Sequence, residues 1–187
     1  MSEPLSAVVV AAGRSQRMGF DKLLTPLGGH PLLLHTLERL MRTGIPAEIV
    51  LVIRPGSEQE MEAVIAPLRD QGSIRLVPGG AQRQDSVQAG LQAVSESSEY
   101  VLVHDAARPF VTKELIDVVL AAAKLSGAAV CGAPCSDSLK EVGEDGLVLQ
   151  TVAVNTAVHV AVRMAGEFVF HPKSAPGGKI WNSNPHL

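Results

Sequence analysis

The chain has 187 residues and a formal net charge of −3; 46% of its residues are hydrophobic and 19% are charged. This composition is typical of one folded domain and excludes a disordered chain. The slightly negative charge argues against a nucleic-acid-binding protein. No apolar run is long enough to cross a bilayer and no secretory signal opens the chain, so we expect no membrane contact and a cytoplasmic location. Because Cys131 and Cys135 lack metal-site and C-x-x-C spacing, we expect both to be reduced.

Short apolar runs alternate with segments that carry apolar residues at helical spacing. Strands are predicted at 6–11, 48–53, 73–77, 99–103 and 127–133. Helices are predicted at Leu32–Arg42, Glu58–Arg69, Asp85–Val94 and Lys113–Lys124. This alternation predicts an α/β fold with a mostly parallel sheet and helices on both faces. Ligands of such sheets bind at the carboxyl ends of the strands.

The first predicted strand runs into a loop of small and basic residues. Ala11, Ala12 and Gly13 leave room for a ligand to approach backbone N–H groups. The cations that follow predict a polyanionic ligand such as a triphosphate. They are Arg14, Arg17 and Lys22. The alternative is a basic loop that only contacts solvent.

Two common nucleotide-binding loops do not match this segment. A P-loop requires four residues between its two glycines and Lys-Ser/Thr after the second, whereas five residues separate Gly13 from Gly19 and Phe20 follows. A dinucleotide-binding fingerprint requires glycine at position 15, which is Ser15 here. The segment therefore matches neither of these nucleotide-binding loops.

A second motif follows the third predicted strand. Gly79 and Gly80 form a turn, and Asp85 or Ser86 can cap the next helix. The amides at a helix start can also bind a base edge or a phosphate. A plain helix cap is the alternative, and Arg83 between the turn and the cap favours ligand binding.

A third motif, V-H-D-A-A-R-P, ends the fourth predicted strand. A carboxylate at this position, Asp105, is costly to bury unless it is paired or binds a metal. Beside a triphosphate site we expect it to bind Mg²⁺, and an ion pair with Arg108 is the alternative. We expect His104 to pack and to form hydrogen bonds rather than to act as a base.

Together these motifs resemble the 2-C-methyl-D-erythritol 4-phosphate cytidylyltransferases. The resemblance rests on A-A-G-x-S-x-R-M-G with Lys22, on G-G-x-x-R-x-D-S-V-x-x-G-L from Gly79, and on V-H-D-A-A-R-P from Val103. It covers about residues 6–152. The first motif is shared with other nucleotidyltransferases, including molybdenum-cofactor cytidylyltransferases. The other two are more specific to the isoprenoid-pathway enzymes.

The resemblance implies a Rossmann-like nucleotidyltransferase fold and the transfer of CMP from CTP to 2-C-methyl-D-erythritol 4-phosphate. It implies that Arg17 and Lys22 stabilise charge at the α-phosphate and that Asp105 holds Mg²⁺. It implies substrate contacts for Arg108 and Ser138. The residues that it implies near the nucleotide are Ala11, Ala12, Gly13, Arg14, Gly80, Arg83, Asp85, Ser86 and Ala106. Another sugar-phosphate or cofactor cytidylyltransferase is the alternative.

The resemblance also implies a homodimer joined by a β-arm, and about residues 134–152 would form the first part of this arm. The chain departs from the family pattern after Val152, which divides it into a domain at 1–152 and an atypical tail at 153–187. Val154 occupies the position of the arm's substrate-binding arginine. We attribute the tail to a frameshift near codon 153, which would leave the arm truncated, a sheet edge uncovered and turnover weak or absent. A catalytically impaired nucleotide-binding protein is therefore a second alternative.

Overall fold

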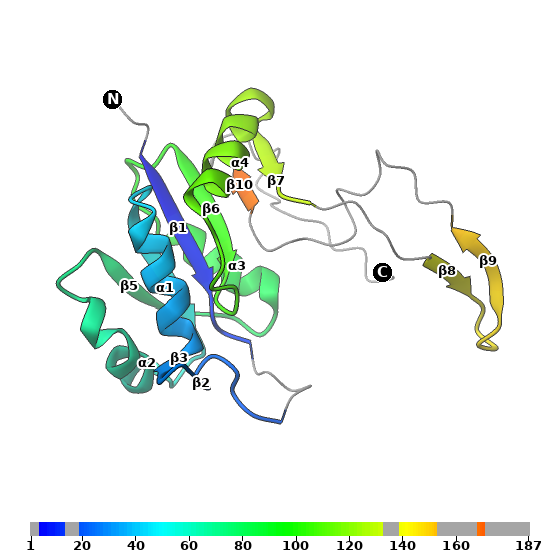
Figure 1. Ribbon diagram of the computed structural model, residues 1–187, viewed down its shortest axis with the longest axis horizontal. Coiled ribbons are helices and arrows are strands. Elements are labelled where there is room, and N and C mark those ends of the chain that lie inside the picture. The colour runs from blue at the N-terminus through cyan, green and yellow to red at the C-terminus, as the bar shows by residue number, and fades with distance from the viewer. Residues whose placement is uncertain (1–3, 14–18, 133–138, 153–167, 171–187) are drawn as a thin grey trace.

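The fold is built on one mixed sheet, and the computed structural model describes residues 4–13, 19–132, 139–152 and 168–170 (Figure 1). The sheet has six strands in the order β5-β4-β1-β6-β10-β7. Strands β1, β4, β5 and β6 are parallel, and β10 is antiparallel to both β6 and β7. The strands are β1 (Leu5–Val10), β4 (Pro46–Ile53), β5 (Ile74–Pro78), β6 (Tyr100–Asp105), β7 (Ala128–Val130) and β10 (Phe168–Phe170). The predicted mostly parallel sheet is confirmed.

Helices cover both faces of the sheet, as predicted. Alternation along β1 separates the two cores, because Val9 packs in one and Val8 in the other. The larger core includes apolar side chains of α1, α2 and α4, whereas α3 packs on the opposite face. The helices are α1 (Leu32–Arg42), α2 (Glu58–Ile65), α3 (Arg83–Gln92) and α4 (Lys113–Ser126).

Local sequence signals explain where these helices begin and end. The Thr112 hydroxyl accepts a hydrogen bond from the Leu115 N–H, 3.2 Å away, at the start of α4. Gly127 ends α4 in a left-handed conformation with φ of 84°. Pro67 lies in a short 3₁₀ helix, η1 (Ala66–Leu68), so the helix predicted at 58–69 is α2 followed by η1.

The tail contributes a strand that the sequence analysis did not predict. Phe168–Phe170 pair with β6 on one side and with β7 on the other. Phenylalanine and valine both favour extended backbone, which suits this run to a strand. β6 is therefore an inner strand, and β7 is the outer strand on this side of the sheet. The expectation of an uncovered sheet edge stays a prediction. The division of the chain at residue 152 stays a prediction.

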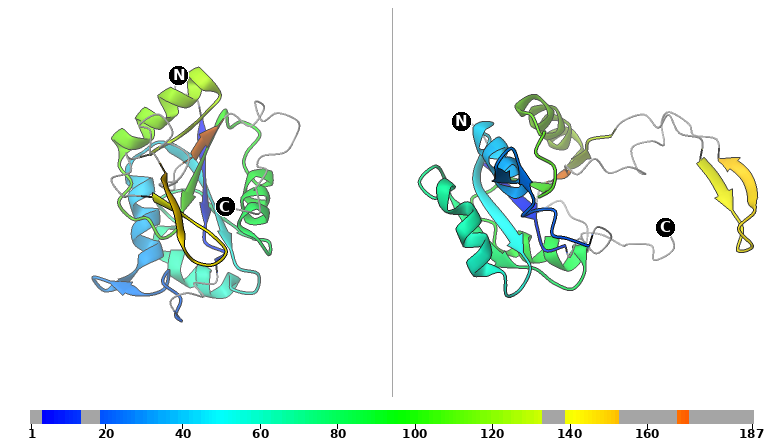
Figure 2. Two further views of the ribbon diagram at one scale, coloured as in Figure 1. Left: turned by 90° about the vertical axis from the view of Figure 1, so that its right-hand side faces the viewer. Right: turned by 60° about the horizontal axis from the view of Figure 1, so that its bottom comes forward.

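Two hairpins lie outside the main sheet. One joins β2 (Pro26–Leu27) to β3 (His30–Pro31) just before α1. The other joins β8 (Leu139–Val142) to β9 (Val148–Val152), within the segment expected to form an arm. Figure 2 shows this second hairpin standing apart from the six-stranded sheet. No helix among the described residues has the length and apolarity to cross a membrane, and the cytoplasmic location stays a prediction.

Candidate functional site

The carboxyl ends of β1, β4 and β6 lie in register, and this brings the first and third motifs together. Val10 on β1 is paired with Val52 on β4 and with Asp105 on β6. The loops that leave β1 and β6 therefore start from adjacent points at one edge of the sheet. This is the edge at which parallel α/β sheets bind ligands.

The second motif packs directly against the first at Gly79. A Cβ atom at this position would lie 2.7 Å from Ala12 Cβ and 2.7 Å from Ser86 Oγ. Such distances are closer than real contacts allow, so only glycine fits between these two side chains. The Gly79 N–H donates to the Ile53 carbonyl at 2.7 Å, which fixes the loop to the end of β4.

Asp85 and Ser86 both stabilise the start of α3. Asp85 Oδ2 accepts a hydrogen bond from the Gln82 N–H at 3.0 Å. The buried Ser86 hydroxyl donates to the Gln82 carbonyl at 3.1 Å and accepts from the Gly80 N–H at 3.2 Å. The capping alternative is therefore present for Asp85, which forms a capping box with Gln82, whereas Ser86 ties the turn before α3 to the helix. Their contact with a nucleotide stays a prediction, as does that of Gly80.

Asp105 joins the second motif to the third. Its Oδ1 lies 2.7 Å from Arg83 Nη2, and its Oδ2 lies 3.0 Å from Arg108 Nε. The predicted alternative of an Asp105–Arg108 ion pair is thus present, and Arg83 provides a second cation. The Asp105 side chain is 25% exposed. It therefore remains within reach of a ligand at this edge.

The N–H groups of two alanines in the first and third motifs form hydrogen bonds within the protein. The N–H of the buried Ala11 donates to the Val52 carbonyl at 2.7 Å, so this N–H is used within the protein rather than offered to a ligand. The N–H of the buried Ala106 donates to the Val10 carbonyl at 3.2 Å. Ala12 is half-buried and Gly13 is exposed. These two residues are the better placed to approach a ligand.

Lys22 is exposed beside an ion pair that the sequence analysis did not identify. Asp21 Oδ1 accepts from the Leu23 N–H at 3.1 Å, and Asp21 Oδ2 lies 2.7 Å from Arg54 Nη2. Arg54 follows the last residue of β4, just as the loop of Arg108 follows β6. Arg54 is a charged residue directly after a buried strand, and this pattern could have identified it from the sequence as a residue of this edge. Arg14, Arg17 and Ser138, which the sequence predicted at the site, lie outside the described residues.

Known proteins that are similar in sequence to this chain share one name. The family model for 2-C-methyl-D-erythritol 4-phosphate cytidylyltransferase matches residues 5–162. A relative of that name from Bacillus cytotoxicus is 40% identical over 147 residues, which is 78% of this chain and 64% of the relative. One from Symbiobacterium thermophilum is 41% identical over 150 residues, or 79% of this chain and 62% of the relative. This chain thus spans less than two thirds of either relative's length.

Solved structures match over more of the chain. The 4-diphosphocytidyl-2C-methyl-D-erythritol synthase of Anaerococcus prevotii has a TM-score of 0.76 and 29% identity, covering 92% of this chain and 73% of that one. The 2-C-methyl-D-erythritol 4-phosphate cytidylyltransferase of Thermus thermophilus has a TM-score of 0.62 and 32% identity, covering 89% and 70%. The resemblance drawn from the motifs is confirmed, and the chain belongs to the 2-C-methyl-D-erythritol 4-phosphate cytidylyltransferase family.

Proposed function

We propose that the chain transfers CMP from CTP to 2-C-methyl-D-erythritol 4-phosphate. The products are 4-diphosphocytidyl-2-C-methyl-D-erythritol and pyrophosphate, as expected for an enzyme of non-mevalonate isoprenoid biosynthesis. The observation that carries this proposal is the meeting of three motifs at one sheet edge. Gly79 packs on Ala12, and Arg83 pairs with Asp105. The family match at residues 5–162 supports the same reaction.

The reaction requires positioning and neutralisation of charge more than covalent help. An oxygen of the 4-phosphate attacks the α-phosphorus of CTP, while the bond to the pyrophosphate oxygen breaks. Negative charge grows on the oxygens around that phosphorus, and fixed cations stabilise it. We assign this role to Lys22, which is exposed next to the Asp21–Arg54 ion pair at the end of β4, and to Arg17 by resemblance. Arg83, at the start of α3 with its Nη2 2.7 Å from Asp105 Oδ1, adds positive charge on the opposite side of Asp105 from Arg108.

The surroundings of Asp105 fit a magnesium ion. The described residues contain no cluster of three or more histidine, cysteine, aspartate or glutamate side chains. One carboxylate suits Mg²⁺, because this ion usually takes few protein ligands and completes its shell with phosphates and water. Each Asp105 oxygen accepts from one guanidinium and keeps a second lone pair. When bound, Mg²⁺ would neutralise triphosphate charge, and Asp105 would hold it.

The acceptor phosphate requires its own cations. Arg108 is exposed on the loop after β6, where it can reach a second phosphate. By resemblance the arm would add Ser138 and an arginine, but position 154 is Val154. A missing charge-assisted hydrogen bond costs about 1.5–3 kcal/mol, so we expect the acceptor to bind weakly and turnover to be slow.

A pyrophosphate-release assay tests the proposal. With CTP, Mg²⁺ and 2-C-methyl-D-erythritol 4-phosphate, we expect slow release that requires all three components. Arg17→Ala should abolish it, because one cation at the α-phosphate is lost; such a loss typically lowers the rate about 100-fold or more. Release with a different sugar phosphate, and none with this acceptor, would contradict the proposed substrate. Calorimetric CTP binding without any release would identify a catalytically impaired protein.

We propose in addition that the chain forms a homodimer through the β8–β9 hairpin. Its apolar side chains lie open to solvent, with Leu147 67% exposed and Leu149 64% exposed. Exposed apolar surface of this kind marks protein contacts. The resemblance to an arm that reaches a second subunit supports a copy of this chain as the partner.

Sedimentation equilibrium tests the dimer. We expect the wild-type chain to have twice the mass of one chain, and the double variant Leu147→Ser/Leu149→Ser to be monomeric. The matched control is Leu125→Ser, which removes a leucine that is 91% exposed on α4, away from the hairpin. A monomeric wild-type chain, or loss of the dimer in the control alone, would show that the hairpin is not the interface.

A further inference from the structure

The loop at 106–111, between β6 and α4, carries Arg108 and adjoins Asp105. Its own backbone provides few hydrogen bonds. The N–H of Arg108 donates to the Asp105 carbonyl at 3.1 Å, and Pro109 has no N–H to donate. Buried carbonyls must still find donors. Three side chains from outside the loop provide them, each to a different carbonyl.

Thr36 holds the beginning of the loop. It is fully buried in the middle of α1, and its hydroxyl donates to the Ala106 carbonyl at 2.8 Å. A buried threonine in a helix usually satisfies its hydroxyl on the carbonyl four residues earlier. Here the Leu32 carbonyl is the more distant partner, at 3.3 Å. The hydroxyl therefore connects α1 to the loop next to Asp105.

His104 holds the middle of the loop. Its side chain is fully buried on β6, and its Nε2 lies 3.0 Å from the carbonyl of Arg108. Because a carbonyl oxygen only accepts, Nε2 carries the hydrogen in this contact. The ring thus fixes the backbone of the residue whose guanidinium pairs with Asp105. The expectation that His104 packs and forms hydrogen bonds is confirmed.

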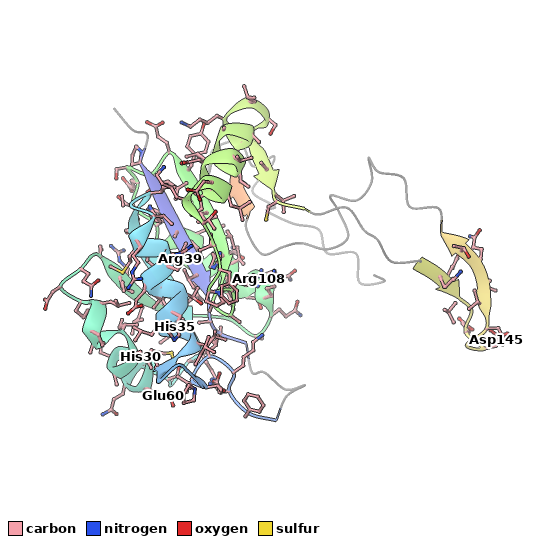
Figure 3. The ribbon with its side chains drawn as sticks, in the orientation of Figure 1. His30, His35, Arg39, Glu60, Arg108 and Asp145 are labelled. Atoms are coloured by element: carbon pink, nitrogen blue, oxygen red, sulfur yellow. The ribbon has the colours of Figure 1, made fainter. Side chains whose placement is uncertain are left out.

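Arg39 holds the end of the loop. It projects from α1, and its Nε donates to the carbonyl of Val111 at 2.9 Å. Figure 3 shows Arg39 on α1 and Arg108 beyond the end of β6. Since Thr36 and Arg39 lie three residues apart on one helix, they contact both ends of the loop from a single rigid element. Movement of the loop would break bonds to both.

We propose that Thr36, His104 and Arg39 are positioning residues that fix the 106–111 loop, and through it the side chains of Asp105 and Arg108, for cytidylyl transfer. The effect on cytidylyl transfer rests on the proposed function. The claim that the three side chains fix the loop is independent of that function. Asp105 would then meet Mg²⁺, and Arg108 the acceptor phosphate, without first ordering the backbone. Such pre-organisation lowers the free energy of activation, because no reorganisation is needed during the reaction.

The decisive comparison is Thr36→Val against Thr43→Val. Thr43 lies at the end of the same helix, and its buried hydroxyl donates to the Leu40 carbonyl at 2.6 Å, away from the loop. Both changes remove one buried hydroxyl at nearly constant volume. Amide hydrogen exchange of the chain without substrates should rise about tenfold at 105–112 in Thr36→Val alone. Thr36→Ser, which keeps the hydroxyl, should restore the wild-type exchange.

The same variants are then compared in the pyrophosphate-release assay. We expect Thr36→Val to lower kcat about tenfold while the KM for CTP changes little, and Thr43→Val to leave both near the wild-type values. Should Thr36→Val not fold, Arg39→Met serves in its place, because Arg39 is exposed and Met retains its aliphatic stem. Unchanged exchange at 105–112 would overturn the positioning role.

The outcomes separate this inference from the proposed function. Suppose that Thr36→Val raises the exchange at 105–112 but has the same kcat and KM as Thr43→Val. The Thr36 hydroxyl would then fix the loop without any effect on the reaction, and this result would overturn the proposal. A wild-type chain that releases no pyrophosphate from CTP with any acceptor would refute the proposed function. In that case the exchange experiment would still decide whether the three side chains fix the loop.

Discussion

Replacement of Asp105 by asparagine is expected to lower the rate of pyrophosphate release by about 100-fold or more, because a preorganised charge at a reacting phosphate contributes on this scale. The change leaves the shape of the side chain nearly constant. It removes the negative charge of the carboxylate, whose oxygens lie 2.7 Å from the Arg83 guanidinium and 3.0 Å from the Arg108 guanidinium. It also removes the carboxylate proposed to hold Mg²⁺. Steady-state rates over a series of Mg²⁺ concentrations measure the effect, and the half-saturating concentration should rise.

A matched control is available on α4. Asp117→Asn also removes a carboxylate from an ion pair, since Asp117 lies 2.7 Å from Lys113 Nζ, but this pair is exposed on the surface of α4 and includes no residue of the three motifs. We expect wild-type rates from this variant. Wild-type rates and an unchanged Mg²⁺ dependence in Asp105→Asn would contradict the role of Asp105 at the site.

Replacement of Gly90 by alanine is expected to destabilise the fold by about 1–3 kcal/mol, the range for forcing an extra methyl into a packed core. In most helices this change stabilises by about 1 kcal/mol. Here a Cβ would overlap Val8 Cγ1 and lie 2.8 Å from Val52 Cγ2. Both valines are fully buried on the central strands, so neither can move aside easily. Urea unfolding measures the sign and the size of the effect.

Gly13→Ala is the control for this substitution. A Cβ at Gly13 would meet no described atom within 4 Å, so we expect little change in stability. The same methyl should weaken CTP binding, because Gly13 is exposed in the loop proposed to approach the phosphates. Stabilisation by Gly90→Ala would contradict the close packing of α3 on β1 and β4.

Elements with strong local signals could be predicted from the sequence. The helix at Leu32–Arg42 was predicted with its observed ends, because Leu33, Leu37 and Leu40 repeat at helical spacing and Pro31 precedes the first turn. The strand at Phe168–Phe170 could not be predicted, because a three-residue run carries no period. Its place depends on partners far away along the chain, at β6 and β7.

The same distinction applies to the site. The contact of Asp105 with Arg108 spans three residues, and local spacing alone suggested it. The contacts of Asp105 with Arg83 and of Asp21 with Arg54 depend on how a helix and a loop pack on the sheet. The Thr36 hydroxyl was missed for this reason too, because its partner at Ala106 is 70 residues away. Sequence motifs identified the groups at the site but not the bonds between them.

The position of β10 also sets the order in which the sheet can form during synthesis. A ribosome releases β6 and β7 well before residues 168–170, yet β10 lies between them. The nascent sheet of β5, β4, β1 and β6 therefore lacks this partner on β6 until residues 168–170 emerge. An open parallel edge of this kind readily pairs with other chains. Insertion of β10 between β6 and β7 pairs this edge, so we expect a chain cut before residue 168 to aggregate more readily than the whole chain.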